Sequence, residues 1–257
     1  MELGLHLGAL HRRLPDVGAL AAEAERLGFD SVWAGEAYGS DAATVAAFVA
    51  ARTSGVRIGT AVMQIPARTP ATTAMTAMTL DHLSGGRFVL GLGMSGPQVI
   101  EGWHGQPSDH PLARTREYVE VVRRAIAREG PLTFDGDHVQ LPRGDGKPLR
   151  STLHPLRTDL PIYLASTGPR NVALAAEIAD GWIPIFFAPS HAEVFAAALA
   201  EGRAHSGRPA FTVAPMVPVA AGEDLPACRG EIRRYLALYL GGMGSKTDNF
   251  YANLVRR

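Results

Sequence analysis

Short apolar segments alternate with amphipathic ones along almost the whole chain, and this alternation limits the possible folds more than any other feature. The apolar segments predict strands and the amphipathic segments predict helices. The expected strands are 2–8, 31–34, 57–63, 88–92, 162–165, 182–186 and 211–219, and the expected helices are 16–27, 41–52, 69–82, 112–128, 169–178, 193–204 and 225–240. Strands this apolar, each followed by a helix, predict a parallel sheet that is covered on both faces.

Seven strand and helix units with no break between domains favour a barrel over an open sheet. We therefore expect one α/β domain over residues 1–257, a TIM-type (β/α)8 barrel whose eighth unit is not visible after 225–240. Residues 130–160 are rich in Pro, Gly, Asp and His and predict an irregular excursion from the barrel. The stretch 93–111 is also expected to be irregular, because Pro97 and the glycines after it resist helix formation.

Composition favours small-molecule chemistry in a reducing compartment. The chain has 25 Lys and Arg against 25 Asp and Glu, and no basic run that would indicate a nucleic-acid or membrane partner. The single cysteine, Cys228, cannot form an internal disulfide. No segment has the pattern of a signal peptide or the length of a membrane span, so we expect a cytoplasmic protein.

Three motifs fall at predicted carboxyl ends of strands, where barrel enzymes keep their sites. Glu36 follows the second strand and could act as an acid, a base or a hydrogen-bond acceptor, or be a surface acid beside the core residue Trp33. The pattern Gly91-x-Gly93-x-x-Gly96 follows the fourth strand. A dinucleotide-binding fingerprint belongs after the first strand, so this position does not fit one. The glycines either let the backbone approach a planar ring or a phosphate, or form a flexible turn.

The third motif, residues 165–171, brings small hydroxyl side chains, a glycine and Arg170 to the start of a predicted helix. Such a turn predicts either a phosphate site or an ordinary helix cap. The histidines His6, His104, His110 and His154 lack the spacing of a metal site, so no metal is expected. No Gly-x-Ser-x-Gly sequence indicates a serine hydrolase.

Taken together, four segments resemble the luciferase-like flavin monooxygenase superfamily, and within it the coenzyme F420-dependent oxidoreductases. These segments are FDSVWAGEA, RIGTAVMQIPARTPATTAMTAMTLDHLSGGRFVLGLGMSG, YLASTGPRNVALAAEIADGW and YLALYLGGMG. The resemblance implies that the cofactor ring packs against a bulge after the third strand, often with a non-prolyl cis peptide, here at Ala61–Val62 or its neighbour.

The same resemblance implies the contacts of the cofactor. Glu36 and Gln64 would contact a deazaflavin ring beside Ala61 and Val62, with Gly93, Met94 and Ser95 against its ring or side chain. The residues that would bind its phosphate are Thr167, Gly168, Arg170 and Asn171.

Two positions depart from relatives that oxidise sugar phosphates, which carry a histidine and a glutamate where this chain has Ala37 and Gly96. That reaction is therefore not expected, and His6, Tyr38 or Glu101 would have to transfer any proton. The catalytic candidates are Glu36, His6 and Tyr38.

The resemblance implies an oxidoreductase that transfers a hydride between coenzyme F420 and a small organic substrate, as a homodimer. The alternatives are an FMN-dependent monooxygenase supplied by a separate reductase, and a non-catalytic flavin-binding or structural relative.

Overall fold

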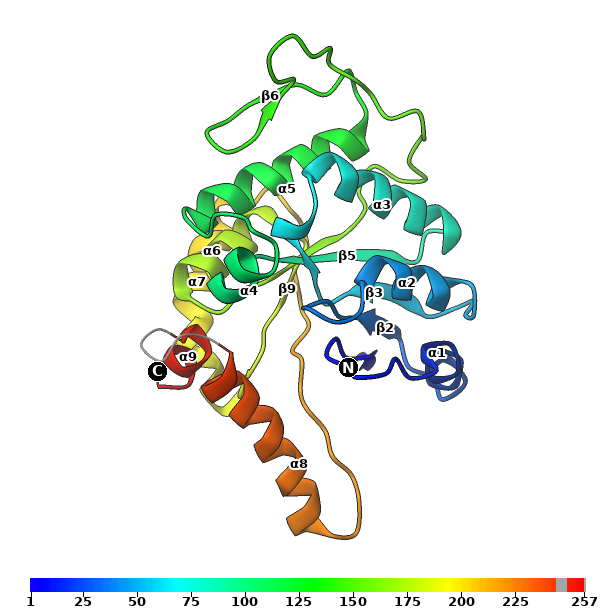
Figure 1. Ribbon diagram of the computed structural model, residues 1–257, viewed down its shortest axis with the longest axis vertical. Coiled ribbons are helices and arrows are strands. Elements are labelled where there is room, and N and C mark those ends of the chain that lie inside the picture. The colour runs from blue at the N-terminus through cyan, green and yellow to red at the C-terminus, as the bar shows by residue number, and fades with distance from the viewer. Residues whose placement is uncertain (244–248, 257) are drawn as a thin grey trace.

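A computed structural model describes residues 1–243 and 249–256, and shows a curled parallel sheet with helices packed on its outer face (Figure 1). The strands are β1 (Gly4–His6), β2 (Ser31–Ala34), β3 (Arg57–Thr60), β4 (Met63–Gln64), β5 (Phe88–Gly93), β6 (Phe134–Asp135), β7 (Gln140–Leu141), β8 (Ile162–Ala165), β9 (Gly181–Ile183) and β10 (Thr212–Val213). The helices are α1 (Val17–Arg26), α2 (Ala42–Ala50), η1 (Ile65–Ala67), α3 (Pro70–Leu83), α4 (Pro97–Gly102), α5 (Pro111–Ala127), α6 (Pro169–Ile178), η2 (Pro189–Phe195), α7 (Ala196–His205), α8 (Leu225–Ala237), η3 (Leu238–Gly242) and α9 (Phe250–Val255). The last residue of the YLALYLGGMG segment, Gly244, lies outside the described residues.

The strand order confirms the predicted α/β barrel architecture. The strands follow one another as β1-β2-β3-β5-β8-β9-β10, with every neighbouring pair parallel and β4 paired to the carboxyl end of β5. A dinucleotide-binding sheet reverses its order at a switch point, and this sheet does not. Within the described part of the chain, β1 and β10 do not pair and no strand follows β10, so the curled sheet stays open.

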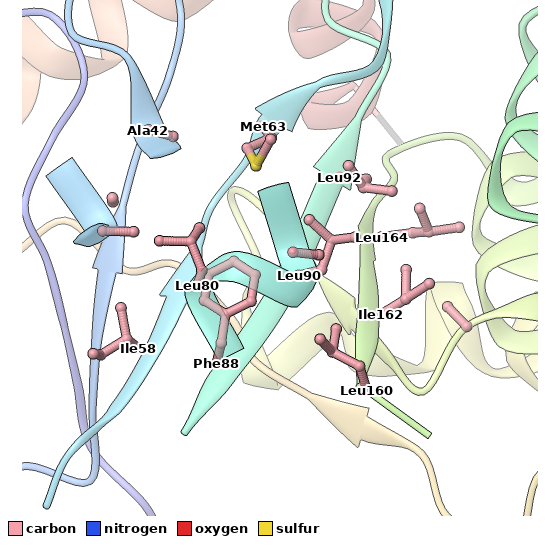
Figure 2. Close-up of a cluster of buried hydrophobic side chains, with 14 of the residues drawn as sticks. Ala42, Ile58, Met63, Leu80, Phe88, Leu90, Leu92, Leu160, Ile162 and Leu164 are labelled. Atoms are coloured by element: carbon pink, nitrogen blue, oxygen red, sulfur yellow. The ribbon is translucent and has the colours of Figure 1, made fainter. Parts of the chain in front are cut away.

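The main hydrophobic core lies between the outer face of the sheet and the helices. Every residue of β5 is buried, and alternate side chains Phe88, Leu90 and Leu92 belong to this core. Figure 2 shows them beside Ile162 and Leu164 of β8. A strand buried on both faces needs apolar residues throughout, which explains the apolar runs of the sequence.

The inner face of the sheet carries a smaller cluster in which aromatic rings fit against glycines. Trp33 and Tyr163 lie with ring centroids 5.9 Å apart, next to Val89. A Cβ atom on Gly59 would lie 2.2 Å from the Trp33 ring, so only glycine leaves room for that side chain. The inside of the half-barrel is therefore packed, as expected for this architecture.

The predicted strand 57–63 is interrupted by a bulge, Ala61 and Val62, between β3 and β4. The peptide bond between these two residues is cis, at the position that the family resemblance implied. The Thr60 hydroxyl takes the place of the missing backbone ladder, because it donates to the Gly91 carbonyl at 2.8 Å and accepts from the Gly91 N–H at 2.9 Å. A Cβ atom on Gly91 would lie 1.8 Å from the Thr60 carbonyl oxygen.

The expectation of no helix in 93–111 is wrong, since α4 begins at Pro97. Proline is tolerated there because the first residues of a helix need no N–H donor within the helix. The expected strand 211–219 is also too long. It is reduced to β10 because Pro215 and Pro218 have no N–H to donate to a neighbouring strand.

The excursion 130–160 is less irregular than expected, since it contains the antiparallel hairpin β6–β7. Glu117 of α5 holds the hairpin tip by accepting from three backbone N–H groups, those of Asp137, His138 and Val139. At the other end of the excursion Arg157 forms an ion pair with the buried Asp81 at 2.8 Å. These contacts fasten the excursion to α3 and α5, above which it lies in Figure 1.

The carboxyl end of the chain departs from the body. The predicted helix 225–240 is α8 followed by the π-helical turn η3, and a further helix, α9, was not predicted. None of the α8 residues is buried, and α8 projects away from the sheet (Figure 1).

The contact between Thr60 and Gly91 gives a first prediction. We expect Gly91→Ala to lower the free energy of unfolding by about 3 kcal/mol, because the added methyl group forces β3 and β5 apart. Gly130→Ala is the control, since a Cβ atom there meets nothing within 4 Å. Urea unfolding followed by circular dichroism measures both, and equal stabilities of the two variants would contradict the packing described.

Candidate functional site

The predicted site residues all follow strands at one edge of the parallel sheet, and the structure brings a subset of them into direct contact. His6 ends β1, Glu36 follows β2, Gln64 ends β4, Ser95 follows β5 and Thr167 follows β8. Carboxyl ends of parallel strands form the functional face of barrels of this kind. The hydrogen bonds around the bulge show what several of these side chains do.

His6 supports the bulge. Its Nδ1 accepts a hydrogen bond from the Gly8 N–H at 3.0 Å, so its Nε2 carries the proton that is donated to the Ala61 carbonyl, also at 3.0 Å. Burial lowers the pKa of His6, the bond to Ala61 raises it and nearby His11 lowers it. A neutral imidazole with both nitrogens engaged is suited to positioning, and proton transfer by His6 would require one bond to break.

Glu36 supports the other side of the bulge. One carboxylate oxygen accepts from the Gln64 N–H at 2.9 Å, and the Arg68 guanidinium binds both oxygens at 2.7 Å. The Glu36 side chain is 8% exposed. Arg68 also pairs with Asp41, which caps α2. The carboxylate thus ties β4 to α2, and its role as a catalytic group stays a prediction.

Gln64 lies at the centre of a polar chain that links three segments. Its amide oxygen lies 2.6 Å from Nε2 of His104, and its amide nitrogen donates to the Ser95 hydroxyl at 3.0 Å. Gln64 is 2% exposed, whereas His104 and Ser95 are half-buried. Ser95 has a φ of 68°, a left-handed conformation that is uncommon for serine and clusters at functional sites.

The residues next to this chain shape the floor of the site. Ala61 and Val62 pack against the inner cluster, and Met94 packs against the main core. A Cβ atom on Gly93 would lie 2.8 Å from a methyl group of Val62, so glycine allows the bulge to lie close to β5. The structure therefore places Val62 of the bulge directly against Gly93 of β5.

The amino end of α6 carries the predicted phosphate-binding residues. Gly168 is the N-cap of α6, so no side chain caps the first N–H groups of this helix. A Cβ atom on Gly168 would meet nothing within 4 Å. Within the described residues, the side chains of Thr167, Arg170 and Asn171 make no hydrogen bond or ion pair. Free backbone N–H groups at a helix start, beside an unpaired Arg170, are suited to an anion.

Tyr38 and Glu101 lie at the periphery. Tyr38 is 45% exposed in the loop after β2, and Glu101 is an exposed residue of α4 that accepts a hydrogen bond from Ser108 at 2.5 Å. The structure brings neither side chain into the hydrogen-bond chain around Gln64. Transfer of a proton by either residue stays a prediction.

An aromatic cluster near Tyr38 was missed by the sequence analysis. Its members are Phe186, which follows β9, with Tyr235, Tyr239 and Tyr251 from the helices α8, η3 and α9. Burial raises the pKa of Tyr239, a hydrogen bond with Tyr235 lowers it and nearby Tyr38 raises it. These contacts join the carboxyl end of the chain to the edge that carries the site.

Two further observations concern other kinds of site. Across the described residues, no three His, Cys, Asp or Glu side chains gather as metal ligands would, and no helix is both long and apolar enough to cross a bilayer. An open cavity of about 670 Å³ lies beside the β6–β7 hairpin, bordered by Arg124 and Phe134. None of the predicted site residues lines it.

The sequence model of the luciferase-like monooxygenase family matches residues 2–257. The chain belongs to this family. Its open parallel sheet and the bulge before β4 are therefore features of a luciferase-like protein.

Similar sequences include named oxidoreductases. A Mycobacterium tuberculosis protein provisionally named a coenzyme F420-dependent oxidoreductase is 50% identical over 268 residues, which cover 100% of this chain and 77% of that protein. The 5,10-methylenetetrahydromethanopterin reductase of Methanolobus tindarius is 33% identical over 72% of this chain, and the match spans only 54% of its length.

Solved structures share the fold. A coenzyme F420-dependent tetrahydromethanopterin reductase from Methanopyrus kandleri superposes with a TM-score of 0.80 at 23% identity, over 95% of this chain and 73% of that one. An F420-dependent secondary alcohol dehydrogenase in complex with an F420–acetone adduct gives a TM-score of 0.85 at 22% identity, covering 98% and 81%. At these identities the likeness concerns the architecture alone.

The environment of His6 gives a prediction for this luciferase-like chain. Because the folded pKa of His6 lies below its ordinary value of 6.5, the unfolded chain binds a proton that the folded chain refuses. The neutral His6 therefore stabilises the fold fully above pH 6.5, and this contribution is lost as the pH falls below 6.5. We expect the wild type to lose more stability than His6→Gln between about pH 7.5 and 5.5. Urea unfolding at both pH values measures the two losses, and an equal loss of stability in the wild type and in His6→Gln would contradict the assignment.

Proposed function

We propose that the protein is an oxidoreductase that transfers a hydride between coenzyme F420 and a small organic substrate. The observation that carries this proposal is the 50% identity, along the whole chain, to a protein provisionally named a coenzyme F420-dependent oxidoreductase. The similarity to a methylenetetrahydromethanopterin reductase supports the same class of reaction. The remaining support comes from the site itself.

The residues present fit a deazaflavin with a phosphate-bearing side chain. The bulge lies close against β5 because Gly93 has no side chain, which leaves a small-residue surface for a planar ring. At the amino end of α6, the open face of Gly168 and the guanidinium of Arg170, which has no partner in the part of the chain that the structure describes, suit a phosphate. In this arrangement Gln64, Met94 and Ser95 would contact the ring, while Thr167 and Asn171 would join the phosphate site.

Bound F420 supplies a two-electron hydride donor or acceptor that reacts poorly with oxygen. The chain's own contribution is orientation and exclusion of water around the reacting carbons. His6 and Glu36 hold the two sides of the bulge rigid through buried hydrogen bonds. Sugar-phosphate oxidation is not proposed, because Ala37 and Gly96 stand where such relatives carry their acid and base.

The homodimer expected from the family also stays a prediction. The two alternatives, an FMN-dependent monooxygenase and a non-catalytic flavin-binding relative, predict different results when F420 and FMN are offered to the protein.

Arg170 gives the prediction that tests the cofactor. We expect the purified protein to bind F420, and Arg170→Met to weaken this binding about tenfold or more, because a charged hydrogen bond to phosphate is lost. A deazaflavin that lacks the phosphate should bind both proteins equally. Arg150→Met, on the exposed excursion, is the matched control. Fluorescence titration gives the dissociation constants.

The same titration with FMN, together with an assay of hydride transfer from reduced F420, distinguishes the competing outcomes. Tight binding of FMN without affinity for F420 would overturn the proposal in favour of the monooxygenase. Binding of F420 with no hydride transfer to activated alkenes, imines or carbonyl compounds would favour a non-catalytic relative.

A further inference from the structure

The hydrogen bonds around Gln64 have a fixed direction. The amide oxygen of Gln64 can only accept, so Nε2 of His104, 2.6 Å away, carries a proton and donates it. The amide nitrogen can only donate, so the Ser95 oxygen, 3.0 Å away, accepts. The Ser95 hydroxyl therefore does not use its own proton in this bond, and within the described residues that proton has no acceptor.

We infer that His104 is a positioning residue that makes Ser95 a hydrogen-bond donor to a carbonyl oxygen of the bound ligand. This inference rests on the proposed function, since it concerns the same site.

The opposite polarity would disable the site. If Nε2 of His104 lacked its proton, the Gln64 amide would turn round to donate to it. The amide oxygen would then face Ser95 and take the hydroxyl proton for itself. Ser95 would present only lone pairs and would repel a carbonyl oxygen. The protonated Nε2 of His104 thus selects the donor state of a residue that it does not touch.

Gln64, Ser95 and His104 belong to three separate segments, and each segment fixes the position of one member of the hydrogen-bonded chain. Gln64 is buried, and its backbone N–H is fixed by Glu36 at 2.9 Å. Ser95 occupies a left-handed position two residues after β5. His104 follows α4, so the short helix that begins at Pro97 determines where the imidazole lies.

The ligand that suits such a donor is a carbonyl group that gains electron density during reduction. A hydroxyl that already accepts a hydrogen bond donates more strongly, and the interaction grows as charge develops on the oxygen. Two sources carry this chemistry, namely a ring carbonyl of the deazaflavin and the carbonyl of a substrate. Measuring cofactor affinity and turnover separately distinguishes them.

The test compares variants that differ in one hydrogen bond. His104→Leu removes the donor at similar size, and His104→Gln restores an amide donor that can reach Gln64. Gln64→Glu replaces the amide donor by a second acceptor, which takes the Ser95 proton. His154→Leu is the matched control, because His154 is an exposed residue of the excursion. For each protein the F420 dissociation constant, kcat and KM are measured.

We expect His104→Leu and Gln64→Glu each to lose about tenfold and His104→Gln to recover most of that loss. A raised dissociation constant for F420 assigns the acceptor to the cofactor ring, and an unchanged constant with lowered kcat/KM assigns it to the substrate. Either result supports the inference. Wild-type behaviour of His104→Leu, or equal loss in His104→Gln, would overturn it.

A measurement without any ligand separates this inference from the proposed function. Nitrogen-15 NMR of the histidine rings is expected to show a proton on Nε2 of His104, and an Nδ1-protonated neutral ring would contradict the inference. Failure of F420 to bind would overturn the proposed function alone, because the direction of the hydrogen bonds is read from the protein by itself.

Discussion

The close approach of Thr60 to Gly91 is the interaction on which the rest of the site depends. Strand β3 leaves the sheet after Thr60, and the threonine hydroxyl satisfies both backbone groups of Gly91 in place of a neighbouring strand. Glycine at 91 and 93 gives the backbone room to bulge without losing contact with β5. His6 and Glu36 then fix the two ends of the bulge. His6 and Glu36, two of the residues that the sequence suggests as catalytic, therefore hold the backbone in shape.

Much of the fold could be predicted from residue patterns, because it depends on local periodicity and on capping. Asp41 and Thr69, the first residues of the helices expected over 41–52 and 69–82, are the N-caps of α2 and α3. The bulge at Ala61 and Val62 came only from the family resemblance. Two of the errors occurred where proline acts differently by position, opening α4 at Pro97 but shortening β10 at Pro215.

The interactions within the site were less predictable, since they join residues far apart in the chain. No periodicity signals that Arg68 binds Glu36, 32 residues away, or that His104 binds Gln64, 40 residues away. In the sequence, His104 stands out only as one of four histidines whose spacing does not indicate a metal site. A buried glutamine at the end of a strand needs partners for its amide, and that requirement is the one signal that pointed to a further residue.

We propose that the bulge and the amino end of α6 together form one deazaflavin site. A crystal structure of the protein with F420 tests it most directly. We expect the ring to lie against Ala61 and Val62, its phosphate to lie within hydrogen-bond distance of Arg170, and a carbonyl oxygen of the ring or the substrate to face Ser95. A ring bound elsewhere, or a phosphate away from α6, would contradict it.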